Sequence, residues 1–166
     1  MNKVFTEENG CYKIDCSKAI WATDSLNHQY HSANCLLSDV DWIMETNQKI
    51  YLVEYKNANI SGAKKPEAFI PTNDTINKVV RKFYDSLHYL SLQGKTKPKE
   101  YVYILEYPNG DSASRKMIRN RLKSKLPFAL QENIGNGIKL IEKVEVLSIA
   151  EWNDHKYYGE FPIQHI

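Results

Sequence analysis

The chain has 166 residues, 42% of them hydrophobic and 25% charged, which is the composition of one globular domain with its own core. Its net charge of +2 permits nucleic-acid binding without indicating it, so the local distribution of charge must decide. Three cysteines without a CxxC pair argue against a disulfide framework or a zinc site, and no apolar run is long enough to span a membrane. We therefore expect a single cytoplasmic domain over residues 1–166 that is not attached to a membrane.

After a polar lead-in, the N-terminal part of the chain predicts a helix near residues 16–26. Asp15 is a suitable N-cap for it, and Ile20 and Trp21 are expected to face inward. The polar segment 27–34 is expected to connect this helix to the first strand.

The segment 38–58 predicts a β-hairpin, because two apolar runs flank a polar turn at Asn47-Gln48. If the turn is centred on these two residues, the strands pair so that Asp41 lies directly opposite Glu54. Cross-strand partners share a face of the sheet, which brings the two carboxylates together.

The same register places Asp39 opposite Lys56, and period-two alternation turns Glu54 and Lys56 to the same face. Carboxylates and a lysine side by side in a sheet are costly to desolvate, so a strand shaped by stability alone would avoid them. The other face is expected to be a core surface, formed by Val40, Trp42 and Met44 against Tyr51, Val53 and Tyr55.

Asp41 followed by Glu54-Tyr55-Lys56 in the next strand resembles the PD-(D/E)xK nuclease superfamily, although Val40 stands where the family pattern has a proline. The resemblance implies a restriction-endonuclease-like fold and hydrolysis that depends on Mg²⁺ or Mn²⁺. It also implies that Asp41 and Glu54 hold the metal together with the backbone carbonyl of Tyr55. Lys56 would then hold the attacking water or neutralise charge on the scissile phosphate.

The residues themselves fit this chemistry, since Mg²⁺ prefers oxygen ligands, keeps several waters and needs only two carboxylates from a protein. An alternative is a structural ion pair between Glu54 and Lys56, aided by Asp41. Further acids are available from elsewhere in the chain, namely Asp39, Asp24, Glu7 and Glu8.

A loop over 59–74 is expected to follow the hairpin and to present Lys64 and Lys65 to nucleic acid. A helix over about 75–92 comes next, capped by Asp74 or Thr75. Its apolar stripe consists of Ile76, Val79, Val80, Phe83, Leu87 and Leu90.

Beside this stripe, Lys78, Lys82 and Ser86 recur at helical spacing. If the helix borders the site, as the resemblance implies, Lys82 and Ser86 would touch phosphate or a metal-bound water. A solvated helix face is the alternative.

A buried strand is predicted over 101–107, then a basic helix from Asp111 or Ser112 to Leu126, and one or two strands within 138–149. The basic helix has six cations and no acid among them: Arg115, Lys116, Arg119, Arg121, Lys123 and Lys125. Its core seam is expected to be Met117, Ile118, Leu122 and Leu126. The cations can follow a phosphate backbone, or they can form a solvated face whose stems cover apolar surface.

Together these elements predict an α/β domain, bordering on α+β, with a mixed sheet flanked by helices. The predicted function is metal-dependent phosphodiester hydrolysis by a DNA endonuclease, possible as a homodimer, with RNA left open as a substrate. The alternative is a non-catalytic nucleic-acid-binding or protein-interaction module with the same fold. Nucleic acid would be bound by Lys64, Lys65, Lys82, Arg115, Lys116, Arg119 and Lys123.

Overall fold

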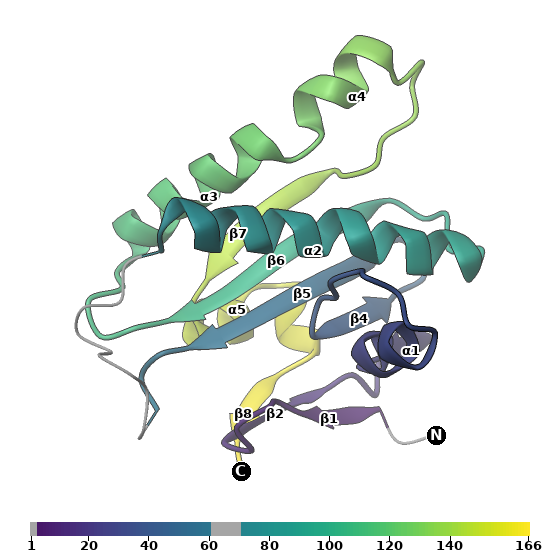
Figure 1. Ribbon diagram of the computed structural model, residues 1–166. Coiled ribbons are helices and arrows are strands. Elements are labelled where there is room, and N and C mark those ends of the chain that lie inside the picture. The colour runs from purple at the N-terminus through teal and green to yellow at the C-terminus, as the bar shows by residue number, and fades with distance from the viewer. Residues whose placement is uncertain (1–2, 61–70) are drawn as a thin grey trace.

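The computed structural model describes residues 3–60 and 71–166 and confirms the predicted α/β class. A central sheet has the strand order β3-β4-β5-β6-β7 (Figure 1). Its strands are β3 (Trp21–Thr23), β4 (Trp42–Glu45), β5 (Ile50–Asn57), β6 (Lys99–Glu106) and β7 (Lys143–Leu147). The pairs β3–β4 and β4–β5 are antiparallel, whereas β5–β6 and β6–β7 are parallel.

Each parallel pair requires a crossover, and the helices α2 (Asn73–Leu92) and α3 (Ser112–Lys125) supply them. Both helices lie on the same face of the sheet (Figure 1). Their apolar stripes pack on the side chains of Ile43, Leu52, Tyr101, Tyr103 and Val146. The predicted stripe of α2 is confirmed, with Leu87 partly buried and the other five residues in the core.

The opposite face of the central sheet is covered by α5 (Ile149–Asp154), the 3₁₀ helix η2 (Tyr158–Glu160) and a small antiparallel sheet. This small sheet has the order β1-β2-β8 and consists of β1 (Val4–Thr6), β2 (Tyr12–Asp15) and β8 (Ile163–His165). The central sheet is therefore the middle of three layers. Two short helices complete the fold, α1 (Leu26–Ser32) and α4 (Phe128–Ile134).

The predicted hairpin and its register are confirmed, since Glu45 pairs with Ile50 and Trp42 pairs with Val53. The predicted core face is also confirmed for five residues, Trp42, Met44, Tyr51, Val53 and Tyr55, which pack beneath α5 and η2. The placement of Val40 on this face is wrong. Val40 lies in the other core, under α2, because the chain leaves the sheet before β4 begins.

The helix predicted near 16–26 is wrong. Asp15 ends β2, and its carboxylate accepts the Ser17 N–H over 2.8 Å in a turn, so it does not cap a helix. Trp21 begins β3, while Ile20 is half exposed and does not face inward. The helix of this region is α1, which falls in the segment that was expected to be a connection.

The helix boundaries differ from the prediction in small ways that capping explains. Thr72 caps α2 by accepting the Thr75 N–H, and Asp111 with Ser114 forms a capping box at the start of α3. Met117 is largely exposed, so its assignment to the core seam of α3 is wrong. Within the described ranges, every helix is too short or too polar to cross a membrane.

Candidate active site

The site lies just before β4, where the chain is not yet paired with β5. Side chains of helix α2 accept hydrogen bonds from the backbone N–H groups of this segment. The Val40 N–H donates to Ser86 Oγ over 3.2 Å, and the Ser38 N–H donates to Asp85 Oδ2 over 2.8 Å. Ser86 is fully buried in this role, so the expectation that it touches phosphate is wrong.

The β4–β5 ladder ends at the pair of Trp42 with Val53, before it reaches Tyr55. The Thr46 N–H donates to the Lys49 carbonyl over 2.8 Å, so these two residues form a hydrogen-bonded pair of the antiparallel ladder. Every second residue along β5 from Lys49 therefore turns both its N–H and its C=O toward β4, and Tyr55 is one of these residues. Its N–H donates to Asp41 Oδ2 over 2.7 Å, while the Val40 N–H is held by α2. The Tyr55 carbonyl therefore points to the same gap as the Asp41 carboxylate, as the predicted metal ligand should.

Asp41 and Glu54 lie close enough together that each carboxylate affects the pKa of the other. Glu54 is only 7% exposed, and Lys82 from α2 binds both of its oxygens, at 2.7 and 2.9 Å. Burial and the neighbouring Asp41 raise the pKa of Glu54 well above its usual value, more than the Lys82 ammonium lowers it. Burial likewise raises the pKa of Asp41.

A cavity of about 610 Å³ opens at this point, at the carboxyl end of β5. Asp41, Lys56 and Lys82 line it, and Lys56 is exposed. In open α/β sheets ligands bind at the carboxyl ends of strands, so the position itself favours a binding site. Among the described residues Lys56 has no ion-pair partner, which leaves its ammonium available to a ligand.

The four further acids named from the sequence all line the same cavity: Asp39, Asp24, Glu7 and Glu8. Glu7 is already engaged, because its carboxylate accepts the N–H groups of Asn9, Cys11 and Tyr12 and so holds the β1–β2 turn. Asp39 accepts a hydrogen bond from Asn27 Nδ2 over 3.2 Å. Asp24 is exposed, so its carboxylate is more available to a ligand than that of Glu7.

The donor set suits a hard divalent cation. Two adjacent carboxylates, with a backbone carbonyl turned to the same gap, are oxygen ligands of the kind Mg²⁺ and Mn²⁺ take. Over residues 3–60 and 71–166 no group of three or more His, Cys, Asp or Glu side chains is arranged to hold a metal, so the remaining ligands would be that carbonyl and water. The close approach of two acids, one of them buried, is a repulsion that a cation would relieve.

The basic helix is only partly available to nucleic acid. Arg115 is buried, and its Nε donates to Glu151 Oε2 over 2.8 Å, so its guanidinium fastens α3 to α5. Arg119 pairs with Glu145 of β7 at 3.6 Å. Both residues were expected to contact nucleic acid, and both form ion pairs with acids that are distant in the sequence.

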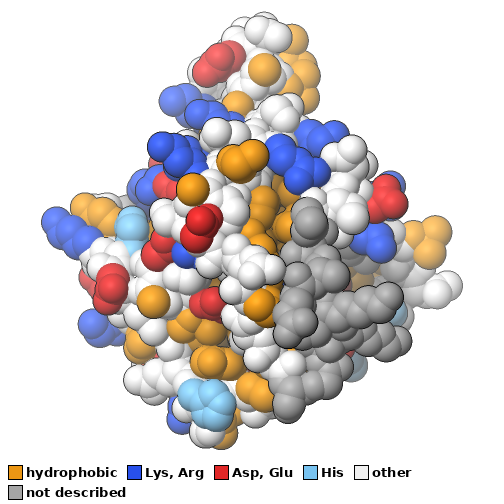
Figure 2. All heavy atoms as spheres, turned by 90° about the vertical axis from the view of Figure 1, so that its left-hand side faces the viewer, with side chains coloured by type: hydrophobic (Ala, Val, Ile, Leu, Met, Phe, Trp, Pro, Cys, Tyr) orange, Lys and Arg blue, Asp and Glu red, His pale blue; other side chains and the backbone are white. Residues whose placement is uncertain are grey.

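Lys116 and Lys123 are exposed on α3, as a phosphate contact requires. The face at the left of Figure 1 shows separate groups of Lys and Arg side chains with acids between them (Figure 2). This face therefore has no continuous basic stripe among the residues that the figure colours. The predicted contacts Lys64 and Lys65 lie outside the described residues.

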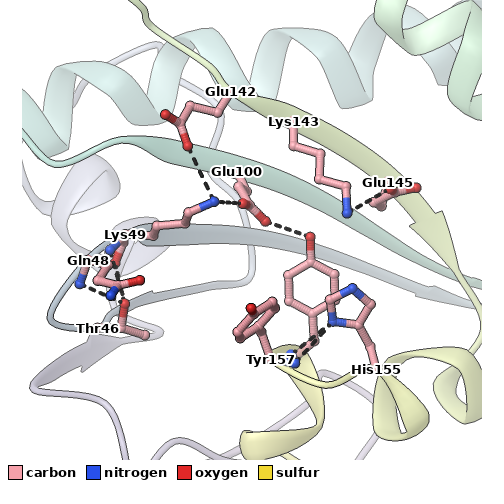
Figure 3. A network of polar contacts seen from close by, with 10 residues as sticks. Thr46, Gln48, Lys49, Glu100, Glu142, Lys143, Glu145, His155 and Tyr157 are labelled. Carbon is pink, nitrogen blue, oxygen red and sulfur yellow. Dashed lines mark hydrogen bonds and ion pairs between the residues drawn. The ribbon is translucent and has the colours of Figure 1, made fainter.

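A second cavity, of about 560 Å³, lies at the opposite end of β5, beside the hairpin turn. Several of the polar residues that line it are labelled in Figure 3. One of the lining residues is the buried Glu100, which binds the Lys49 ammonium and accepts a hydrogen bond from Tyr158 Oη over 2.6 Å. The His155 ring stacks on Tyr158 with the ring centres 3.9 Å apart. Each of these polar groups has a partner within the protein, which gives the network a structural role.

Comparison with known proteins adds no relative to this picture: no family model, curated protein or solved structure matches the chain. A function must therefore be argued from the chemistry of the site.

Proposed function

We propose that this protein is a metal-dependent phosphodiesterase of the PD-(D/E)xK type, with a restriction-endonuclease-like core, and that it cleaves DNA in the cytoplasm. One observation carries the proposal. The β4–β5 register brings Asp41 against the buried Glu54 where the ladder ends, beside a cavity that Asp41 and Lys56 line. A stability role would not require carboxylates, a free lysine and an open cavity in the same place.

In this proposal Asp41 and Glu54 hold Mg²⁺ or Mn²⁺ with the carbonyl of Tyr55. The cation, when bound, polarises a phosphate oxygen and lowers the pKa of a water ligand. Lys56 orients the attacking water or neutralises the charge that develops on the scissile phosphate. Lys116 at the start of α3, which lies at the same edge of the sheet as the cavity, guides the duplex by its charge.

A second candidate function is a nucleic-acid-binding module that does not cleave. The ion pair of Lys82 with Glu54 favours it, since both oxygens of this carboxylate are satisfied without a metal. The two adjacent carboxylates beside an open cavity favour the enzyme, because a module that only binds nucleic acid has no need of acids there.

The test is a cleavage assay of the purified protein on plasmid, linear duplex, single-stranded DNA and RNA, with Mg²⁺, Mn²⁺ or EDTA. Asp41→Asn, Glu54→Gln and Lys56→Met are assayed in parallel, with Glu132→Gln, an exposed acid on α4, as the matched control. We expect metal-dependent cleavage of DNA that the three site variants lose and the control keeps.

Activity that survives in all three variants would remove the site assignment. DNA binding without cleavage, by folded protein with metal present, would favour the second candidate. Cleavage of RNA alone would keep the chemistry and change the substrate.

A further inference from the structure

We propose that Lys82 couples metal binding to phosphate binding: it occupies Glu54 until a divalent cation displaces it, and the released ammonium then binds the phosphate of the substrate. This inference rests on the proposed function and adds a role for a residue outside the Asp41/Glu54/Lys56 set. Lys82 lies at the middle of α2, directly over β5, and its ammonium binds both Glu54 oxygens in the present state.

The first step of the argument is that one carboxylate cannot serve both cations. A metal bound between Asp41 and Glu54 needs oxygens of Glu54, and both of these are 2.7–2.9 Å from the Lys82 ammonium. The two carboxylates supply two negative charges, so a divalent cation neutralises them fully. If Lys82 stayed in place beside the metal, it would add an unbalanced positive charge to a partly buried cluster.

The second step concerns where Lys82 goes. Its side chain already lines the cavity, together with Asp41 and the exposed Lys56. A lysine has a flexible four-carbon stem, so its ammonium can move from Glu54 into the cavity without movement of α2. Its new partner there is an anion, and a phosphate held at the metal is the anion that the proposed substrate brings.

The third step is thermodynamic. If the metal frees Lys82 for phosphate, then phosphate must also favour the metal, because coupling between two ligands is reciprocal. Without metal the lysine is sequestered, so the protein holds DNA weakly. Without phosphate the metal must compete with the lysine, so metal affinity is low. Both ligands together satisfy all the charges.

The experiment measures Mn²⁺ binding by calorimetry and by electron paramagnetic resonance, in the absence of substrate. Lys82→Met removes the competing cation and should bind Mn²⁺ about tenfold more tightly than the natural protein. Lys82→Arg presents a bidentate guanidinium that holds Glu54 more firmly, so it should bind Mn²⁺ more weakly. Lys78→Met, one turn earlier on the exposed face of α2, is the matched control and should not change the affinity.

The second measurement tests the coupling itself with a phosphorothioate duplex, which keeps its charge and resists hydrolysis. Adding Mn²⁺ should raise duplex affinity about tenfold in the natural protein and in Lys78→Met, but by a clearly smaller factor in Lys82→Met, where only charge neutralisation remains. A methylphosphonate duplex lacks the charge. For this duplex, the rise in affinity on adding Mn²⁺ should be the same in the natural protein and in Lys82→Met.

The outcomes separate this inference from the proposed function. Mn²⁺ affinity is expected to rise from Lys82→Arg through the natural protein to Lys82→Met. If Mn²⁺ binds through Asp41 and Glu54 but its affinity does not follow this order, the coupling role of Lys82 is wrong and the metal site stands. If Mn²⁺ binds none of the proteins, both proposals are wrong. Should Lys82→Met fail to fold, the weaker binding expected of Lys82→Arg, which keeps the ion pair, still decides the matter.

Discussion

Tyr158 donates its phenolic hydrogen to the buried carboxylate of Glu100 over 2.6 Å, which ties η2 to the start of β6. Tyr158→Phe leaves a carboxylate oxygen without this donor at 6% exposure, and we expect a loss of about 1–3 kcal/mol in the free energy of unfolding. Urea denaturation measures it. Tyr157→Phe, at a neighbouring ring that is 55% exposed, is the control and should change stability by less than about 0.5 kcal/mol. Equal effects would show that the Glu100 network does not stabilise the fold.

The basic helix should divide into a structural and a binding part. Arg115→Met removes the partner of Glu151, whose Oε2 also accepts the Ser148 N–H over 2.8 Å at the start of α5. We expect it to destabilise the protein by about 1–3 kcal/mol and to leave DNA affinity per folded molecule unchanged. Lys116→Met should do the reverse. We expect no loss of stability, and a slope of log DNA affinity against log salt concentration that is smaller by about one. Thermal unfolding and binding titrations at several salt concentrations separate the two. An Arg115 variant that keeps its stability but loses DNA binding would contradict this division.

Glu54 should make stability depend on pH in the direction opposite to an ordinary paired acid. Its pKa is raised in the folded state, so its contribution is fully present below its usual value of 4.5 and is lost as pH rises through the raised pKa. In EDTA, the natural protein should therefore lose stability relative to Glu54→Gln as pH increases from about 4 to 8. His155 also titrates in this range, but it is common to both proteins and cancels in the difference. A difference that does not vary with pH would mean that Glu54 is not buried beside Asp41.

Lys56→Met should affect turnover and not folding. Lys56 is exposed and lacks an ion pair in the described part of the chain, so its loss should change stability by less than about 0.5 kcal/mol. If Lys56 serves the water or the transition state, kcat should fall by about 10²-fold or more while KM changes little. Lys139→Met, another exposed lysine, is the control. An unchanged kcat would shift the role to Lys82.

Ser86→Ala should weaken the candidate metal site indirectly, through the segment that positions Asp41. The Val40 N–H loses its acceptor, which we expect to cost about 1–2 kcal/mol and to loosen the segment that positions Asp41. Metal affinity should fall together with stability, as calorimetry and urea denaturation can show. Ser91→Ala on the exposed end of α2 should change neither. Full metal affinity in Ser86→Ala would show that α2 does not position Asp41.

The hairpin was predictable because its signals are local. Period-two alternation and a two-residue turn determine which residues of adjacent strands meet, and so the meeting of Asp41 with Glu54 follows from the sequence. The apolar stripe of α2 was predictable for the same reason, since helical spacing repeats over about four turns from Ile76 to Leu90.

What the sequence concealed depends on contacts between distant segments. The strands β1, β2, β3 and β8 have only three or four residues each, too few for a periodic pattern. The faces of α2 were visible, but its position along β5, which decides that Lys82 meets Glu54, is set by the crossover and by packing on the sheet. Arg115 and Arg119 were assigned to DNA because their acidic partners are far away in the chain.

The two sides of the cavity differ in how far apart their parts lie along the chain. Asp41 and Glu54 belong to one hairpin, whereas the wall that Glu7 and Asn9 contribute rests on a small sheet in which β2 pairs with β8, from the other end of the described chain. Closing a short loop loses less entropy than closing a long one, so we expect the hairpin to form early and this wall late. The acidic pair would then form before the cavity that encloses it. A partly folded chain would have the two carboxylates side by side, and only the complete fold would have the finished site.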